Sequence, residues 1–171
     1  MFEKIGSKGQ AAMEYLMTYG WALLVIVIVI AILLIMNPFS APQSCKFDSV
    51  GFGCSNMVVV SKAGSSSFLL GGITNGNNNA VKIYHVECVK SSAAKPAYSL
   101  TASSNYTEVS NQGVYSFNAT TTSPDYVACA DAPTIAGADF SGRIWVFYKN
   151  SEDGTDYPLR SVSANLVTKT L

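Results

Sequence analysis

Residues 8–36 read KGQAAMEYLMTYGWALLVIVIVIAILLIM, and this stretch decides the fold of the chain. The 21 residues from Leu16 to Met36 carry no charge. An α-helix rises about 1.5 Å per residue, so a helix of this length spans about 30 Å, the thickness of the hydrocarbon core of a bilayer. Asn37-Pro38 ends the pattern, because a proline disfavours helical geometry in the residue before it. We therefore expect a membrane-spanning helix over residues 10–37 and a connector over residues 38–44.

The flanks of the apolar run predict its orientation and its retention. Lys4 and Lys8 precede it, and positively charged flanks stay on the cytoplasmic side, so the C-terminal part is expected outside the cell. A conventional secretory signal would instead be removed after the run, at a site with small residues. Such a site is poorly formed here, because Pro42 follows Ala41 and Phe39 occupies a position that needs a small side chain. Retention of the helix is therefore favoured.

Glu14 is the one formal charge between Ala11 and Met36. An ionisable group in an apolar helix is costly to insert, which makes Glu14 a candidate functional residue. If the chain is cut between Gly9 and Gln10, the new amino group lies four residues before Glu14, one helical turn away on the same face. There the carboxylate can neutralise the amine of its own chain or of a neighbour, and a place in the first turn suits the helix dipole. The alternative is that Glu14 marks the interfacial start of an ordinary signal anchor.

These residues together resemble a known family. A short basic leader ending in Lys8-Gly9, then Gln10, an acid at the fifth position after the cut and an unbroken apolar helix resemble the class III signal peptide of archaeal type IV pilin-like proteins. That pattern often has Leu where this chain has Thr18. The resemblance implies that a prepilin peptidase removes residues 1–9 and that Gln10 and Glu14 act in assembly. It also implies that the retained helix anchors the subunit in the membrane and later forms the core of a filament of identical or related subunits.

Downstream of the helix the hydrophobic period changes to two, which predicts β-strands. Turn clusters lie between the alternating runs, among them Gly71-Gly72, residues 75–79 and Asp153-Gly154, of which the last predicts a hairpin. We expect about seven or eight strands in all. Named runs are Met57–Val60, Ala80–Lys90, Gly113–Asn118, Arg143–Lys149 and Leu159–Thr170. The predicted fold class is α+β, with the long apolar helix followed by an all-β sandwich, immunoglobulin-like, over residues 45–171.

The four cysteines all lie in the part of the chain expected outside the cell. An even number in an exported domain predicts two disulfides, for which three pairings are possible. We favour Cys45–Cys54, which closes a small loop, and Cys88–Cys129, which ties the longest alternating run to the stretch before the last hairpin. Free buried thiols are the alternative. A zinc site requires closer Cys-x-x-Cys spacing than this chain has.

The single histidine lies in the alternating run over residues 80–90. Strict alternation places Val81, Ile83 and His85 on one side of the strand and Val86 and Cys88 on the other. His85 and Cys88 therefore do not form a nucleophile–base pair. No phosphate loop or dinucleotide fingerprint occurs elsewhere in the chain. We expect no catalytic residues, no cofactor and no metal.

Two further groups of residues suggest surface features. Glu152, Asp153 and Asp156 offer oxygens for Ca²⁺, but they lack the register of a calcium loop, so a solvated turn is the favoured interpretation. Asn105 and Asn118 each begin an N-glycosylation sequon. Archaeal pilins are often glycosylated, so the resemblance raises the expectation that these sites are used.

Composition and charge point to a structural role. The formal net charge is zero and only 13% of the residues are charged, so there is no basic excess that would attract nucleic acid. A neutral surface associates readily. The neutral composition suits packing into an assembly, and the resemblance implies that the chain is a pilin, the structural subunit of an archaeal type IV-like surface adhesion filament. The alternative is a membrane-anchored extracellular β-sandwich binding domain that does not polymerise. An archaellum subunit fits less well, because those subunits usually lack the acid found here as Glu14.

Overall fold

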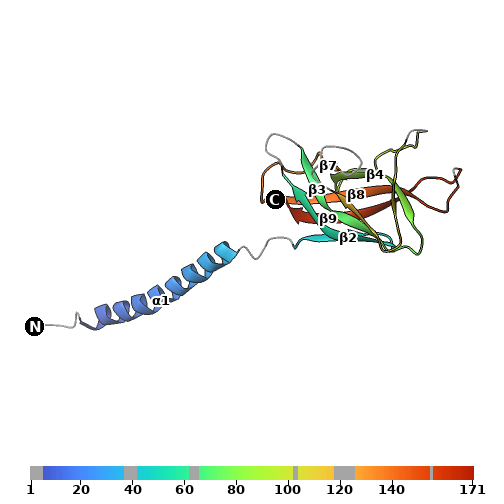
Figure 1. Cartoon of the computed structure of the whole chain (residues 1–171). Helices are drawn as coiled ribbons and strands as arrows, with labels where there is room; N and C mark the ends of the chain where they lie inside the picture. Colours follow the sequence, from blue (N-terminus) through green and yellow to red (C-terminus); the bar gives the residue numbers. More distant parts are fainter. Residues whose placement is uncertain (1–5, 37–41, 62–65, 102–103, 118–125, 155) are drawn as a thin grey trace, which may run out of the picture. The chain divides into compact units, whose positions relative to one another are not determined.

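The computed structural model describes residues 6–36, 42–61, 66–101, 104–117, 126–154 and 156–171 (Figure 1). The chain divides into two compact units, Met1–Ser40 and Ala41–Leu171. Among the described residues, the first unit contains one helix and the second contains strands with the segments that join them. The expected fold class, α+β with an N-terminal apolar helix before an all-β domain, is confirmed.

The helix α1 runs from Gly6 to Met36. The stretch Met13–Met36 has a mean hydropathy of 3.0, and every side chain in it is exposed. The helix has no polar face opposed to an apolar one, which distinguishes it from the amphipathic helices that cover a soluble core. It has the length and composition of a membrane anchor or a signal sequence.

Nine strands are described in the second unit. They are β1 Ser44–Phe47, β2 Phe52–Val60, β3 Ser67–Asn75, β4 Val81–Lys90, β5 Thr107–Val109, β6 Val114–Phe117, β7 Ala128–Cys129, β8 Asp139–Asn150 and β9 Arg160–Lys169. The five alternating runs named from the sequence correspond to β2, β4, β6, β8 and β9. The other four strands either have two to four residues or, in β3, contain a glycine pair.

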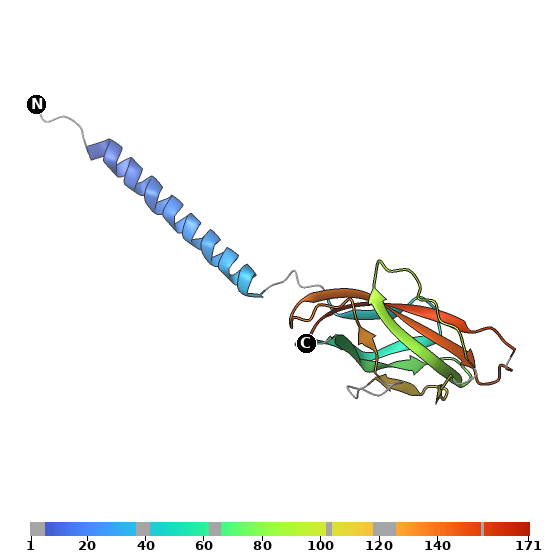
Figure 2. The ribbon, with the colours of Figure 1, turned by 90° about the horizontal axis from the view of Figure 1, so that it is seen from above.

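The strands form one continuous and mostly antiparallel sheet in the order β1-β9-β8-β4-β7-β3-β2, with β5 paired to β4 and β6 to β3. The two ends of this order come together, because Cys45 of β1 is bonded to Cys54 of β2. Val59 of β2 also forms a parallel bridge with Thr170, and Leu171 donates a backbone hydrogen bond to the Val59 carbonyl at 2.9 Å. The sheet therefore folds over on itself as a sandwich with barrel-like closure, which Figures 1 and 2 show from two directions.

The core lies between the two layers of the folded sheet. Its most buried side chains come from both layers, with Leu69 and Ile73 on β3 facing Ile144 and Val146 on β8 and Leu166 on β9. Side chains at every second position of a strand share a face, so the alternation of β8 fills the core from one side only. The hairpin of β8 and β9 pairs ten residues from each strand, which confirms the hairpin expected from the sequence.

The alternation of β4 differs from the prediction. The buried residues are Val81, Ile83, Val86 and Cys88, whereas His85 is partly exposed. The pairing of β4 with β8 shifts register between Ile83 and His85, and an extra residue at such a β-bulge reverses which side chains face the core. The assignment of Val81, Ile83 and His85 to one face is therefore wrong, although His85 and Cys88 do lie on opposite faces.

The expected turn at Gly71-Gly72 is also wrong, because both glycines lie within β3. Gly71 has a positive φ of 119° beside a register shift in β2, and a Cβ there would lie 2.5 Å from the carbonyl oxygen of Asn56. A Cβ on Gly72 would lie 2.7 Å from the carbonyl oxygen of Tyr115 on β6. The glycines are required by close approach of the neighbouring strands, not by a turn.

Candidate functional site

The first candidate site is the surface of α1, which is apolar on every side. Exposed fractions of its large apolar side chains range from 40% at Val25 to 83% at Ile35. An uncovered apolar surface of this extent marks a region that contacts lipid or other protein. The helix therefore presents an apolar surface around its whole circumference.

Glu14 is the charged residue on this surface. Its side chain is exposed, and among the side chains that the structure describes its carboxylate has no hydrogen-bond or ion-pair partner. The carbonyl oxygen of Glu14, by contrast, accepts a hydrogen bond of 2.5 Å from the Thr18 hydroxyl one turn later. A hydroxyl bonded to its own helix is tolerated in an apolar segment. Thr18 is thus satisfied within α1, and Glu14 is left with a carboxylate that needs a partner.

The helix starts earlier than the sequence predicts, and this changes the position of Glu14. Since α1 begins at Gly6, Glu14 is not in the first turn of the uncut chain. The expectation that the helix dipole favours Glu14 concerns the cut chain and stays a prediction. The dipole acts only within the first turn of a helix. Gly9 and Gln10, the expected cleavage residues, lie inside the helical segment. Removal of residues 1–9 would bring Glu14 to the fifth position of the shortened helix.

The cysteines form the two pairs that the sequence favours. Cys45 is bonded to Cys54, with Cα atoms 5.9 Å apart, and Cys88 is bonded to Cys129, with Cα atoms 4.9 Å apart. Cys88 and Cys129 are directly opposite each other where β4 and β7 pair in parallel. The first disulfide joins β1 to β2, so both bridges connect strands of the folded sheet.

The two sequons have different outcomes. Asn105 is exposed and lies just before β5, so its amide is open to a glycosyltransferase. The neighbouring Tyr106 packs against Tyr84, with ring centroids 5.5 Å apart, and the ammonium of Lys82 lies 5.2 Å from the Tyr106 ring. Asn118 lies outside the described residues. Whether either asparagine carries a glycan stays a prediction.

The acidic residues of the β8–β9 connection make contacts within the protein. Asp153 accepts a backbone hydrogen bond of 2.9 Å from Asn150 and lies 3.5 Å from the guanidinium of Arg160. Glu152 accepts a hydrogen bond of 3.0 Å from Asn79. No group of three or more His, Cys, Asp or Glu side chains suited to a metal occurs in the part of the chain that the structure describes. Asp153 thus has structural partners at the ends of β8 and β9, and Glu152 has one in the β3–β4 connection.

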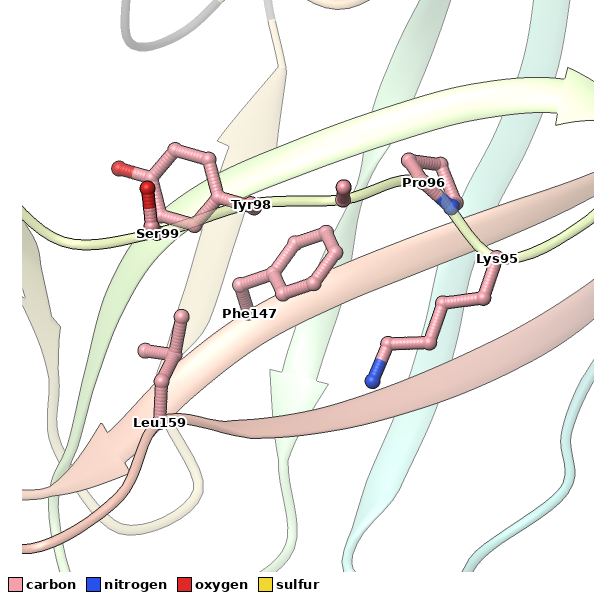
Figure 3. Close-up of a pocket in the computed structure, with 7 residues that line it drawn as sticks. Lys95, Pro96, Tyr98, Ser99, Phe147 and Leu159 are labelled. Carbon is pink, nitrogen blue, oxygen red and sulfur yellow. The ribbon is translucent and has the colours of Figure 1, made fainter.

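A cavity of about 460 Å³ opens beside β8 (Figure 3). It is lined by Lys95, Pro96, Ala97, Tyr98, Ser99, Phe147 and Leu159. Residues 95–99 form an extended segment without regular secondary structure, and Figure 3 shows this segment passing over β8 with the rings of Tyr98 and Phe147 close together. The sequence did not indicate this site, because its walls come from three separate parts of the chain.

Comparison of the chain with protein-family models, with characterised proteins and with solved structures finds no match.

Proposed function

We propose that this chain is a pilin, the structural subunit of an archaeal type IV-like surface adhesion filament. In this proposal a prepilin peptidase cuts between Gly9 and Gln10, and the subunit stays in the membrane through α1 until it assembles. The β domain then forms the outer shell of a filament outside the cell. The observation that carries the proposal is the apolar surface of α1, exposed on every side and marked by the one carboxylate of Glu14.

The driving force for assembly is burial of the helix. A helix of this size taken out of the membrane exposes more than about 1,000 Å² of apolar surface, worth about 25 kcal/mol or more at 25 cal/mol per Å². Packing α1 among identical helices removes this surface from water on all sides. A helix with one apolar stripe would gain much less from such a bundle. The absence of a polar face in α1 therefore supports a filament core.

Glu14 sets the register of assembly in this proposal. Its carboxylate has no partner among the described side chains, and an unpaired charge in an apolar bundle is strongly unfavourable. The amine of Gln10, created by cleavage, supplies a partner of opposite charge. Pairing between Glu14 of one subunit and the amine of its neighbour fixes the axial position of each helix.

The testing experiment replaces Glu14 with Gln in the cells that make the filament. Glu14→Gln keeps the size of the side chain and removes the charge, so cleavage and membrane insertion are expected to proceed while filament yield falls at least about tenfold. Glu14→Asp is the matched control that keeps the charge. Filaments are counted by electron microscopy, and cleavage is followed by mass. Normal filament yield from Glu14→Gln would contradict the proposed mechanism.

The second candidate function is a membrane-anchored binding domain that does not polymerise. The cavity between residues 95–99 and β8 favours it, because a concave site with aromatic walls is suited to a ligand. In this case α1 serves only to anchor the domain in the membrane, and Glu14→Gln is expected to be tolerated. Neither function requires a catalytic residue or a cofactor.

A further inference from the structure

The cavity beside β8 has a preformed aromatic wall. The imidazole of His85, which is not one of the residues that line the cavity, supports the wall by stacking on Tyr98 with ring centroids 4.7 Å apart and planes 10° apart. Phe147 completes the group, with its ring centroid 5.2 Å from that of Tyr98 and 6.1 Å from that of His85. Contacts of this kind hold rings in defined orientations. The wall is therefore in place before a ligand arrives.

The wall is built outside the hydrophobic core. Ile144 and Val146 point into the core, and Phe147 is only 2% exposed although it is not part of the core cluster. In Figure 3 its ring lies between β8 and the extended segment over residues 95–99. Tyr98 is half-buried and Leu159 lies beside the same opening. One side of the cavity is thus apolar.

The other side of the cavity is polar and cationic. The ammonium of Lys95 lies 5.8 Å from the ring centroids of both Trp145 and Phe147, and no described carboxylate lies within ion-pair distance of it. Beside Lys95, the indole nitrogen of Trp145 is buried without an acceptor in the described structure. The cation is positioned by the rings and keeps its three hydrogen-bond donors for another group.

The segment that borders the cavity has free backbone groups. The N–H and C=O groups of Ala97, Tyr98 and Ser99 make no hydrogen bond to any described residue, and neither does the Ser99 hydroxyl. An apolar ligand seated there would remove these groups from water without giving them partners, which is unfavourable. The ligand therefore needs hydroxyl groups as well as an apolar surface.

We propose that this cavity binds a carboxylated sugar residue of an acidic polysaccharide. A pyranose ring has an apolar face of C–H groups, which packs against the partly exposed side chains of Tyr98 and Leu159, while the buried Phe147 supports Tyr98 from behind. Its hydroxyls bond to the free backbone groups and to Ser99. Its carboxylate pairs with the Lys95 ammonium, an interaction that is stronger than a hydrogen bond between neutral groups. A cavity of about 460 Å³ is of the size that holds small ligands.

The proposal goes beyond filament assembly and does not depend on it. Every residue of the site belongs to the β domain, and none belongs to α1. A filament subunit and an anchored domain would bind the sugar in the same way. Loss of binding therefore tests this site, whereas the yield of filaments tests the role of Glu14.

The test uses the full chain in detergent micelles and measures binding of trigalacturonate by titration calorimetry. We expect Lys95→Gln to weaken binding about tenfold, the loss of one charge-assisted hydrogen bond. Lys46→Gln is the matched control, because Lys46 is an exposed lysine of β1 outside the cavity. Tyr98→Ala removes part of the apolar wall from a segment outside the sheet, and it is expected to weaken binding as well. Circular dichroism verifies that each variant is folded.

Two further ligands test whether the site recognises a sugar, a carboxylate or both. Neutral galactotriose is expected to bind about tenfold more weakly than trigalacturonate, the same loss of affinity that is expected for Lys95→Gln. Benzoate, a carboxylate on a ring without hydroxyls, is expected not to bind measurably. The proposal is overturned if trigalacturonate does not bind at millimolar concentration, or if Lys95→Gln and Lys46→Gln weaken binding equally. Binding of benzoate as tight as that of trigalacturonate would overturn the assignment to a sugar.

Discussion

The hydroxyl of Thr18 donates a hydrogen bond of 2.5 Å to the carbonyl oxygen of Glu14, one helical turn earlier in α1. The two side chains differ in whether they have a hydrogen-bond partner. Thr18 is satisfied by its own helix. The Glu14 carboxylate is not, among the described side chains. A hydroxyl bonded to a carbonyl of its own helix has its donor in use, whereas an ionisable group in an apolar segment requires a partner. Thr18 therefore bonds within its own helix, whereas we expect Glu14 to pair with a group of another molecule.

The first prediction concerns Thr18→Val. This change removes the hydroxyl and keeps the shape of the side chain, while the Glu14 carbonyl remains in the backbone ladder of the helix. Cleavage and filament yield are expected to stay within about twofold of the wild type. The measurement is the count of filaments in parallel with Glu14→Gln. A loss of filaments from Thr18→Val as large as that from Glu14→Gln would show that any polar change at this end of α1 is harmful.

The two disulfides are predicted to contribute unequally to stability. The loop closed by Cys88–Cys129 has a sequence separation of 41 and that of Cys45–Cys54 one of 9. Loop-closure entropy assigns about 4 kcal/mol to the first and about 3 kcal/mol to the second. Urea unfolding of the two double Cys→Ser variants measures the difference. An equal or larger loss for the Cys45–Cys54 pair would mean that closure of the sheet between β1 and β2 matters more than loop length.

The glycine of β3 opposite the bulge in β2, Gly71, is predicted to resist substitution. Gly71→Ala places a Cβ 2.5 Å from the Asn56 carbonyl oxygen at a φ of 119°, which is expected to lower the free energy of unfolding by about 1–3 kcal/mol. Gly154→Ala is the control, because its Cβ would meet no atom nearer than 3.9 Å. It is expected to change stability by less than about 0.5 kcal/mol. Similar thermal midpoints for the two variants would argue against the bulge.

Asn75 is predicted to hold the β3–β4 connection together. Its side chain is 1% exposed, its amide nitrogen donates to the carbonyl oxygens of Asn79, Val109 and Ser110, and its amide oxygen accepts from Asn77. Asn75→Asp replaces the donor with a charge that faces three carbonyl oxygens, at an expected cost of about 3 kcal/mol. Asn111→Asp, at an exposed side chain with one such bond, is the control. Equal unfolding midpoints would contradict the role of Asn75.

The features predicted correctly from the sequence are those that a repeating pattern within one segment of the chain indicates. The apolar run of α1 and the alternation of β8 and β9 repeat over many residues, so a local irregularity does not hide them. The even number of cysteines predicts two disulfides and leaves three possible pairings, of which the favoured one is present. The start of α1 at Gly6 was missed because the polar leader has no apolar period, although residues 6–9 are part of the helix.

The features that were missed depend on contacts between distant parts of the chain. Gly71-Gly72 has the composition of a turn, and only the close approach of β2 and β6 explains why the pair lies in a strand. The bulge after Ile83 reverses the faces of β4 without any local sign. The cavity combines Lys95, Phe147 and Leu159, and residues 95–99 have no period that would predict their path across β8.

The most direct measurement for the central claim is the intact mass and N-terminal sequence of the protein isolated from its own cells. A mature chain that starts at Gln10, with the mass lowered by the hydrogens lost in the two disulfides, is the predicted result. It would place α1 at the N-terminus of the mature subunit, as filament assembly requires, and extra mass at Asn105 would report a glycan. A chain that starts at Met1, or beyond residue 40, would contradict the account.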